Sequence, residues 1–307
     1  MRVRSMALLL ALGAGFLPGA VLAQPDPPAL AAAKRRQTAA GSLTVDFQRT
    51  EKAAKGAVTI GLLSAPGERP FPDEETTLTS DNRLRFFGNK YRYERNHPVW
   101  APDERKVLPV RLINVWDGTT DKSFYPSGLS EKASEGTVYR DRRSRDIRDV
   151  VLVPLLLAFR GADPALSPYP AADLEATADT EVVSGQKCQV FRHPRHPNLR
   201  LWLDPAADSL VRRIRWTAKG KTTGEAVVSP VRDPTCGWRP GGWTHTQYAP
   251  DGAVLFTHVV RVTAVNYTSP LPDDFALTFP PGTVVTDATN GKLFRVGPGG
   301  VWSELPR

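Results

Sequence analysis

The sequence predicts a mainly β protein with a few helices (α+β), built on one antiparallel sheet, and three observations support this class. The 307 residues include 24 glycines and 28 prolines, and few runs after residue 50 favour a helix. Segments that alternate apolar and polar residues follow one another through short turns without intervening helices, which is typical of an antiparallel meander. No repeat of fixed period divides the chain. We therefore expect a single domain over residues 24–307.

The first 23 residues have the pattern of a signal peptide. Arg2 and Arg4 precede an uncharged apolar stretch over residues 6–22, and Val21 and Ala23 suit cleavage by signal peptidase after residue 23. The alternative is an uncleaved membrane anchor. The stretch is short for a membrane span of about 20 residues, and glycine and proline interrupt it. We expect an exported mature chain.

The elements of the first half can be read in order. Residues 29–40 are rich in good helix formers, and Gly41 offers a left-handed stop. Residues 43–48 then alternate apolar and polar side chains, as in a half-buried strand. A further strand is predicted over residues 57–63. Residues 83–86 and 90–94 predict a hairpin around Gly88-Asn89, and residues 110–115 and 122–125 predict two strands around the turn Asp117-Gly118. The proline-rich segment 97–109 between them is expected to be a loop.

One internal helix is predicted over residues 146–160. It is apolar nearly all round, with Asp146 and Asp149 at its N-terminal end and Arg160 at the other, and Gly161 should end it. Pro154 should kink it. A helix this apolar in a soluble protein must be buried on most sides or fill a cavity.

The second half again predicts strands and turns. The expected strands cover residues 187–193, 199–203, 210–217, 225–229, 243–248 and 254–265, followed by short strands at 293–296 and 301–302. Asn198, Asp204-Pro205, Gly220 and Asp251-Gly252 mark the turns. One sheet is therefore expected to run through both halves of the chain.

The motifs of common enzymes are absent or poorly placed. The sequence has no G-x-S-x-G elbow and no P-loop, and Ser184 begins an S-x-x-K string that turns directly into a strand. His193 and His196 have H-x-x-H spacing, but neighbouring prolines forbid the helix that would place both rings on one face. We expect no catalysis, no cofactor and no metal site.

The charge is modestly basic. Without the signal peptide the excess of Lys and Arg over Asp and Glu is six. The arginines gather over residues 140–145, where aspartates are interleaved, and over 212–215, on one face of a predicted strand. Nucleic-acid binding requires a basic groove with aromatic platforms, so we expect no nucleic-acid partner. Attraction to an anionic membrane surface fits an exported protein better.

Two cysteines exclude a disulfide-dense scaffold. Cys188 lies on a predicted strand and Cys236 in a loop, and an oxidising compartment would permit a bridge between them. The alternative is two covered free thiols. The sequence leaves both open.

Aromatic residues recur on successive strands at positions able to share one face: Phe86, Tyr91, Tyr93, Trp116, Phe124, Tyr125, Trp202 and Trp216. They are either a simple core or a concave apolar wall for an acyl chain. A sheet closed by a single apolar helix would leave a gap between helix and wall, which suits a long hydrocarbon.

Several strings, in order along the chain, resemble the exported lipoprotein carriers of the LolA/LolB type. They are LTVDFQRT (43–50), RLRFFGNKYRYE (83–94), NVWDGTTDKSFYP (114–126), LVPLLLAFRG (152–161), GQKCQVF (185–191), LRLWLDPAADSLVRRIRW (199–216) and DDFALTFPPGTVV (273–285). The chain departs from the carriers at Phe87-Gly88-Asn89, where they carry an arginine that helps to hold a closed lid, and in its longer loops at 64–73 and 97–109.

The resemblance implies an incomplete antiparallel β-barrel, or half-barrel, with helices over its concave side and an apolar cavity for acyl chains. It implies a periplasmic carrier of lipids or lipidated proteins, expected to be a monomer, without catalysis. An envelope sensor or interaction module with the same fold, binding envelope membrane proteins, is the alternative. The candidate cavity residues are Phe86, Tyr91, Tyr93, Trp116, Phe124, Leu155, Leu156, Phe159, Trp202 and Trp216.

Overall fold

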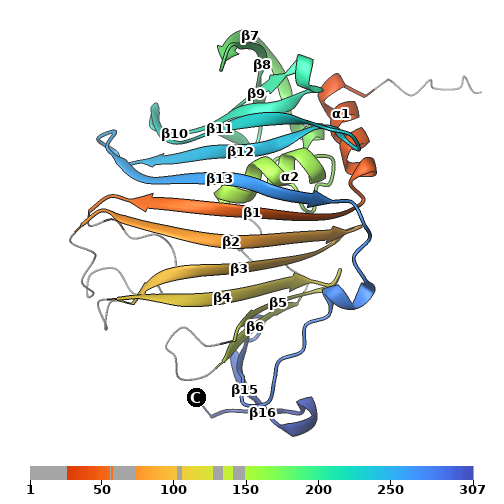
Figure 1. Ribbon diagram of the computed structural model, residues 1–307, viewed down its shortest axis with the longest axis vertical. Helices are drawn as coiled ribbons and strands as arrows, with labels where there is room; N and C mark the ends of the chain where they lie inside the picture. The colour runs from red at the N-terminus through yellow and green to blue at the C-terminus, as the bar shows by residue number, and fades with distance from the viewer. Residues whose placement is uncertain are drawn as a thin grey trace, which may run out of the picture.

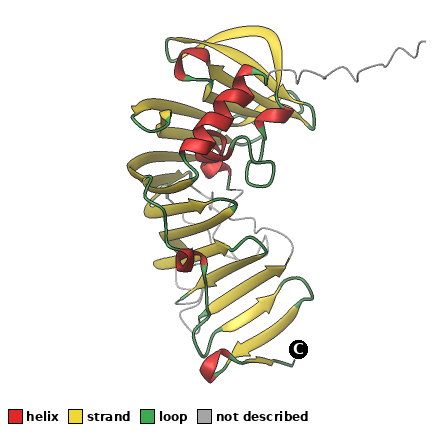
Figure 2. Cartoon of the chain, turned by 90° about the vertical axis from the view of Figure 1, so that its right-hand side faces the viewer, coloured by secondary structure: helices red, strands yellow, loops and turns green. Residues whose placement is uncertain are grey.

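The computed structural model describes residues 26–55, 57, 74–101, 106–126, 134–140 and 149–306. Their strands form one sheet in the order β16-β15-β14-β6-β5-β4-β3-β2-β1-β13-β12-β11-β10-β9-β8-β7. The sheet is open and curved, and helices lie against its concave face (Figures 1 and 2). The predicted half-barrel with helices on its concave side is confirmed. The predicted signal peptide lies outside the described residues.

The first half of the sheet is a meander of antiparallel strands. They are β1 (Ser42–Ala53), β2 (Thr76–Phe87), β3 (Lys90–Ala101), β4 (Lys106–Trp116), β5 (Thr120–Tyr125) and β6 (Glu135–Arg140). The predicted hairpin between β2 and β3 is confirmed, and Gly88 adopts the positive φ of 55° that its turn requires. The strand predicted over residues 57–63 falls almost entirely outside the described residues, and the sequence did not predict β6.

The sequence suggested a proline-rich loop over residues 97–109, but the described parts of this segment, residues 97–101 and 106–109, are strands. β3 and β4 continue through it, and Pro98 pairs with Pro109 in their register. The pairing of β3 with β2 ends at Asn96, and that of β4 with β5 begins at Ile113. Within the part of the chain that the structure describes, each proline therefore lies where its strand has a partner on only one side, so the missing N–H can point away from the ladder.

The second half of the sheet is also antiparallel. Its strands are β7 (Glu175–Val183), β8 (Gln186–His193), β9 (His196–Asp204), β10 (Leu210–Ala218), β11 (Lys221–Asp233), β12 (Gly237–Tyr248) and β13 (Val254–Asn266). Each of the six predicted strands is confirmed, with longer bounds. The sequence missed β7, an edge strand whose mostly exposed residues carry no apolar alternation.

The chain then crosses the sheet to its far edge. β13 pairs with β1, and the segment from residue 267 passes through η5 (Pro272–Phe275) to β14 (Val284–Asp287), β15 (Lys292–Val296) and β16 (Trp302–Glu304). β14 pairs with β6 in parallel, while all the other strand pairs among the described residues are antiparallel. The crossover places the C-terminal strands beside β6, far from β13 (Figure 1).

Helix α1 (Pro28–Ala39) is confirmed, but its expected left-handed stop is wrong. The helix is followed by Ala40 with φ −104°, and Gly41 does not have a positive φ. The carbonyl oxygens of both residues accept hydrogen bonds from the guanidinium of Arg160. A buried arginine therefore satisfies this helix end, and no left-handed residue is needed.

The apolar helix is shorter than predicted. A 3₁₀ turn, η2 (Val150–Leu152), leads into α2 (Val153–Arg160), and residues 146–148 lie outside the described residues. Pro154 does not kink the helix, because it stands in the first turn, where its missing N–H would have no helical partner. α2 with η2 spans about 18 Å, from rises of about 1.5 and 2.0 Å per residue.

Both faces of the sheet carry a core. The main cluster lies on the concave face and includes α2, while a second lies on the opposite face beneath the crossover segment (Figure 2). The second cluster contains Ile113, Val115, Phe124, Val138, Phe275, Leu277, Phe279, Val285 and Val296. Phe279 packs its ring against Phe124, with centroids 5.7 Å apart.

Replacing Phe279 by alanine is expected to lower the free energy of unfolding by about 3 kcal/mol or more, since a buried aromatic ring leaves a cavity. Urea unfolding measures the loss. Leu271→Ala, in the same segment but 71% exposed, should change stability little. Equal losses for the two variants would contradict the docking of this segment.

Candidate functional site

Helix α2 lies buried on the concave face of the sheet. All eight of its residues are buried, and Leu155, Leu156, Ala158 and Phe159 are fully inaccessible. It touches α1 as well as β10 and β12. The expectation that such an apolar helix must be buried is confirmed.

The expected gap between this helix and the sheet is not seen among the described residues. A cavity of about 20 Å³ lies between α1, α2 and strands β9 and β10, lined by Ala29, Leu157, Leu201 and Val211 among others. By this measure a single water molecule needs roughly 10–15 Å³. The space holds one water and no hydrocarbon, so α2 itself fills this part of the hollow.

Most of the predicted cavity residues do meet on the concave face. Phe86, Tyr91, Tyr93, Trp116, Leu155, Leu156 and Phe159 belong to the main core cluster, and Trp216 is half-buried against it. We call the apolar surface around α2 the α2 trough. It is defined by nine strand residues that belong to the same cluster as α2: Val45, Phe47, Leu84, Phe86, Ile214, Ala226, Val228, Trp243 and Val260.

Two predicted residues lie on the other face, contrary to the expectation of one shared wall. Phe124 belongs to the cluster beneath the crossover segment. Trp202 packs with Val183, Cys188 and Val190 in a third cluster. Strand periodicity assigns alternate residues to opposite faces, but it does not say which set faces the helix.

Arg160 fastens the C-terminal end of α2. Its guanidinium donates to the carbonyl oxygen of Ala40 at 2.8 Å and to that of Gly41 at 3.3 Å. The same group lies 4.3 Å from the centre of the Phe86 ring. Burial lowers the pKa of Arg160 to about 10, so it stays charged at neutral pH. The helix end is thereby tied to the start of β1.

Arg49 fastens the N-terminal end through Asp149, the residue before η2. Arg49 Nη1 lies 3.1 Å from Asp149 Oδ2, and Arg95 Nη1 lies 3.8 Å from the same oxygen. The other carboxylate oxygen accepts a hydrogen bond from the N–H of Val151 at 3.0 Å, which caps the turn. Burial alone would raise the pKa of Asp149, but Arg49 and Arg95 together lower it. The carboxylate is therefore ionised and held by two arginines.

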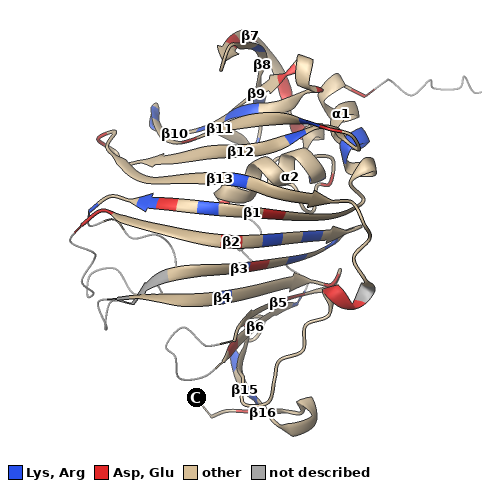
Figure 3. Cartoon of the chain, in the orientation of Figure 1, with Lys and Arg blue, Asp and Glu red and all other residues tan. Residues whose placement is uncertain are grey.

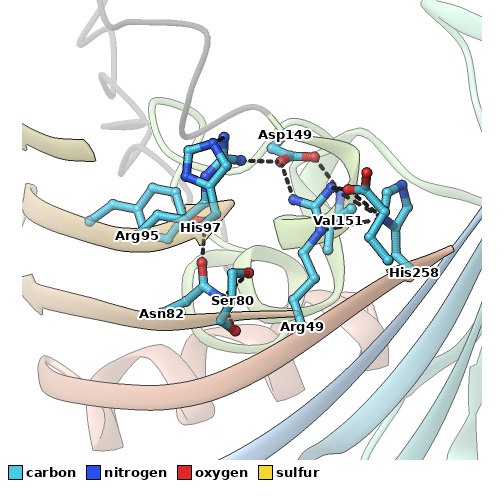
Figure 4. A network of polar contacts seen from close by, with 10 residues as sticks. Arg49, Ser80, Asn82, Arg95, His97, Asp149, Val151 and His258 are labelled. Carbon is cyan, nitrogen blue, oxygen red and sulfur yellow. Dashed lines mark hydrogen bonds and ion pairs between the residues drawn. The ribbon is translucent and has the colours of Figure 1, made fainter. Parts of the chain in front are cut away.

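Further polar side chains surround this contact (Figure 4). Arg49 also donates to Glu51 at 2.9 Å and to Nδ1 of His258. Nη2 of Arg95 lies 2.7 Å from Nε2 of His97. Because an arginine can only donate, Nε2 of His97 accepts and its proton lies on Nδ1. We call Arg49, Glu51, Arg95, His97, Asp149, His245 and His258 the polar cluster.

Four buried polar atoms at this end of the concave face have no hydrogen-bond partner among the described residues. They are Arg95 Nε, His97 Nδ1, His245 Nδ1 and Trp243 Nε1. His245 is 2% exposed and Trp243 is 3% exposed. A buried polar atom without a hydrogen-bond partner lowers the stability of the fold, so such atoms are rare in folded proteins.

Stability should fall on acidification because of His245. Burial, followed by the neighbouring His258, lowers the pKa of His245 to about 4. An unfolded histidine titrates near 6.5, so below this pH the unfolded chain binds the extra proton and the folded state does not. Stability is then lost between about pH 6.5 and 4, at about 1.4 kcal/mol per pH unit. Urea unfolding of wild type and His245→Leu at several pH values measures the slope, and an unchanged slope in the variant would contradict it.

The sequence did not single out the polar cluster. Arg49 and Glu51 continue the inward positions of β1 after Leu43, Val45 and Phe47. This is the one signal that was present: charged residues at positions whose alternation predicts burial. Their partners come from β3, β13 and the start of η2, which no local pattern connects.

The two cysteines are free and do not form the bridge that the sequence left open. Cys188 lies in the third cluster, and Cys236 belongs to the main one. The Sγ atom of Cys236 lies 3.1 Å from the hydroxyl of Tyr267. Burial raises the pKa of both thiols, which makes them poor nucleophiles at neutral pH.

The histidine pair of the sequence stands at the turn between β8 and β9. The rings of His193 and His196 lie 4.7 Å apart, beside Tyr169. Among the described residues, no group of three or more His, Cys, Asp or Glu side chains is arranged to hold a metal ion. Within the same residues, no helix is long and apolar enough to cross a membrane.

The arginines of β10 do not form a free basic stripe. Arg212, Arg213 and Arg215 pair with Asp204, Glu181 and Glu225 at 2.7–2.8 Å. β1 and β2 likewise carry both signs of charge (Figure 3), and Arg83 contacts Asp46 between them. Of the arginines predicted over residues 140–145, only Arg140 is described, and it faces Asp287.

No protein-family model matches the sequence, and no curated protein matches it. Among solved structures, the chain is similar to a LolA superfamily protein from Nitrosomonas europaea. The two share 11% sequence identity with a TM-score of 0.43, over 80% of this chain and 97% of the other.

Proposed function

We propose that this protein is an exported, periplasmic carrier that binds the acyl chains of lipids or lipidated proteins in the α2 trough. One observation carries the proposal. A short apolar helix covers the concave face of an open sheet and is tied by an arginine at each end. Without it, the sheet would present a long apolar hollow with a charged rim.

The helix is suited to being exchanged for a hydrocarbon. An isolated helix shorter than about 12–15 residues is marginal in water, so α2 depends on its contacts with the trough. It buries five large apolar side chains (Val153, Leu155, Leu156, Leu157 and Phe159), worth roughly 8–15 kcal/mol at about 1.5–3 kcal/mol each. A chain of about 14 methylenes would contribute about 11 kcal/mol on the same scale. The two contributions are similar, so a long acyl chain can replace the helix at little net cost.

A co-purified ligand tests the proposal. The protein should be extracted gently from its native envelope and measured by native mass spectrometry. We expect added masses that correspond to acyl species, which are lost after delipidation. A clean apo mass in every preparation would count against a carrier. Retention of an envelope protein by the delipidated chain would instead favour the sensor or interaction module.

Ligand binding should release α2. Hydrogen exchange of the amides over residues 150–160 is expected to become faster when a long-chain acyl ligand is added, because the chain takes the place of the helix. α1 serves as the internal control, since its exchange should change less. Slower exchange over residues 150–160 would show that the helix closes over the ligand, and the exchange of helix for hydrocarbon would then be wrong.

A further inference from the structure

Residues 149–160 have the form of an amphiphile. The carboxylate of Asp149 is followed by η2 and α2, which together are about 18 Å long and carry mostly apolar side chains. The carboxylate lies between Arg49 and Arg95, and the apolar part lies in the α2 trough. The concave face of the sheet is thus covered by a segment of the chain with a charged group at one end and an apolar part after it.

Removing this segment would leave the polar cluster with an excess of positive charge. Among its described members, Arg49 and Arg95 face Glu51 and Asp149. If α2 leaves the trough, Asp149 is displaced with it, and the buried Arg49 and the half-buried Arg95 are left with Glu51 as the one acidic member of the polar cluster. An uncompensated buried charge is strongly unfavourable. The vacated position therefore favours an anion.

Unpaired donors point to the same chemistry. Nδ1 of His97 carries a proton without a partner, and Nε of Arg95 and Nε1 of Trp243 are buried donors without one. These groups have spare capacity for oxygen acceptors beyond those of Asp149. Oxyanions accept several hydrogen bonds at once, whereas an ester or an alcohol accepts fewer and carries no charge.

From this arrangement we infer that the ligand of the trough is an amphiphile whose head carries an oxyanion, a carboxylate or a phosphate, bound between Arg49 and Arg95 in place of Asp149. The inference rests on the proposed function and names the class of its ligand. Asp149 then competes with the ligand head for the same two guanidinium groups.

Matched ligands test the inference. Oleate and methyl oleate have the same chain and differ in head charge, and a lysophosphatidate adds a phosphate head. Displacement of a fluorescent fatty-acid probe from the full chain, below the micelle concentration of each ligand, gives their affinities. We expect oleate or the lysophosphatidate to bind roughly tenfold or more tightly than methyl oleate. If oleate binds more tightly than the lysophosphatidate, the head is a carboxylate, and if the lysophosphatidate binds more tightly, the head is a phosphate.

Two variants separate the roles. Asp149→Asn keeps the oxygen that caps Val151 but removes the competing charge, so it should tighten oleate binding and leave methyl oleate nearly unchanged. Arg95→Gln should reduce the preference for the charged head, since Arg49 alone remains to bind it, whereas Arg83→Gln on the opposite face should leave the preference unchanged. Equal affinities of wild type for oleate, lysophosphatidate and methyl oleate would overturn the inference and leave the carrier standing. No binding of any of these ligands would count against the carrier itself.

Discussion

Leu156→Asp is expected to detach α2 from the sheet and to lower the free energy of unfolding by about 4 kcal/mol or more. Leu156 is fully buried at the centre of the helix, within the main core cluster. A carboxylate there would be unpaired, and the apolar contacts of the leucine would be lost as well. Detachment exposes the α2 trough, so the variant should bind a hydrophobic dye such as ANS in its folded state.

Val150→Asp is the matched control for this variant. Val150 lies in η2, six residues earlier in the same segment, but it is 41% exposed. The same carboxylate placed there meets water and should change stability by less than about 0.5 kcal/mol. Near-UV circular dichroism and urea unfolding check both variants. If Leu156→Asp unfolds like wild type and binds no dye, the helix is not seated as described.

Arg49→Met is expected to cost about 3–5 kcal/mol, because it leaves the buried Glu51 without its arginine and Asp149 with only the more distant Arg95. The loss should be concentrated at the N-terminal end of the apolar segment. Amides over residues 150–153 should exchange faster in the variant, while those of α1 should be less affected. Hydrogen exchange combined with urea unfolding measures both effects.

The free energy of the Arg49 ion pairs can be separated from the cost of leaving a buried carboxylate unpaired. Arg83→Met breaks an ion pair of similar geometry with Asp46, but Arg83 is 49% exposed, so the loss should stay within about 1 kcal/mol. Adding Asp149→Asn to Arg49→Met removes the stranded carboxylate and should recover part of the loss. Equal costs for Arg49→Met and Arg83→Met would show that burial does not matter at this site.

The elements that the sequence predicted well are those that a local pattern encodes. The alternation of β1, the Gly88-Asn89 turn and the run of leucines in α2 each depend on neighbours within a few residues, and each is found in the structure. The errors also have local causes. Prolines over residues 97–109 suggested a loop, because a single sequence does not show that Pro98 and Pro109 lie in a strand pair without outer partners.

The candidate site divides in the same way. Seven of the predicted cavity residues lie in the main core cluster, since apolar strand positions and an apolar helix have to be buried somewhere. Phe124 and Trp202 were assigned to the wrong face, because periodicity orders residues into two sets without saying which set the helix covers. The gap expected between α2 and the sheet is nearly filled by side chains. The volume left between two packed layers depends on how they fit together, so the sequence alone does not give it.

By itself, the sequence determined a mainly β chain with one apolar helix that has to be buried, because hydrophobic periodicity and turn chemistry act over short stretches. Only the tertiary structure decided that Asp149 meets Arg49 and Arg95, residues 100 and 54 positions away along the chain. Such a contact depends on the register of β1 against β2 and of β2 against β3. Register is set by the summed pairing of whole strands and by the helix that covers them, so no local pattern carries it.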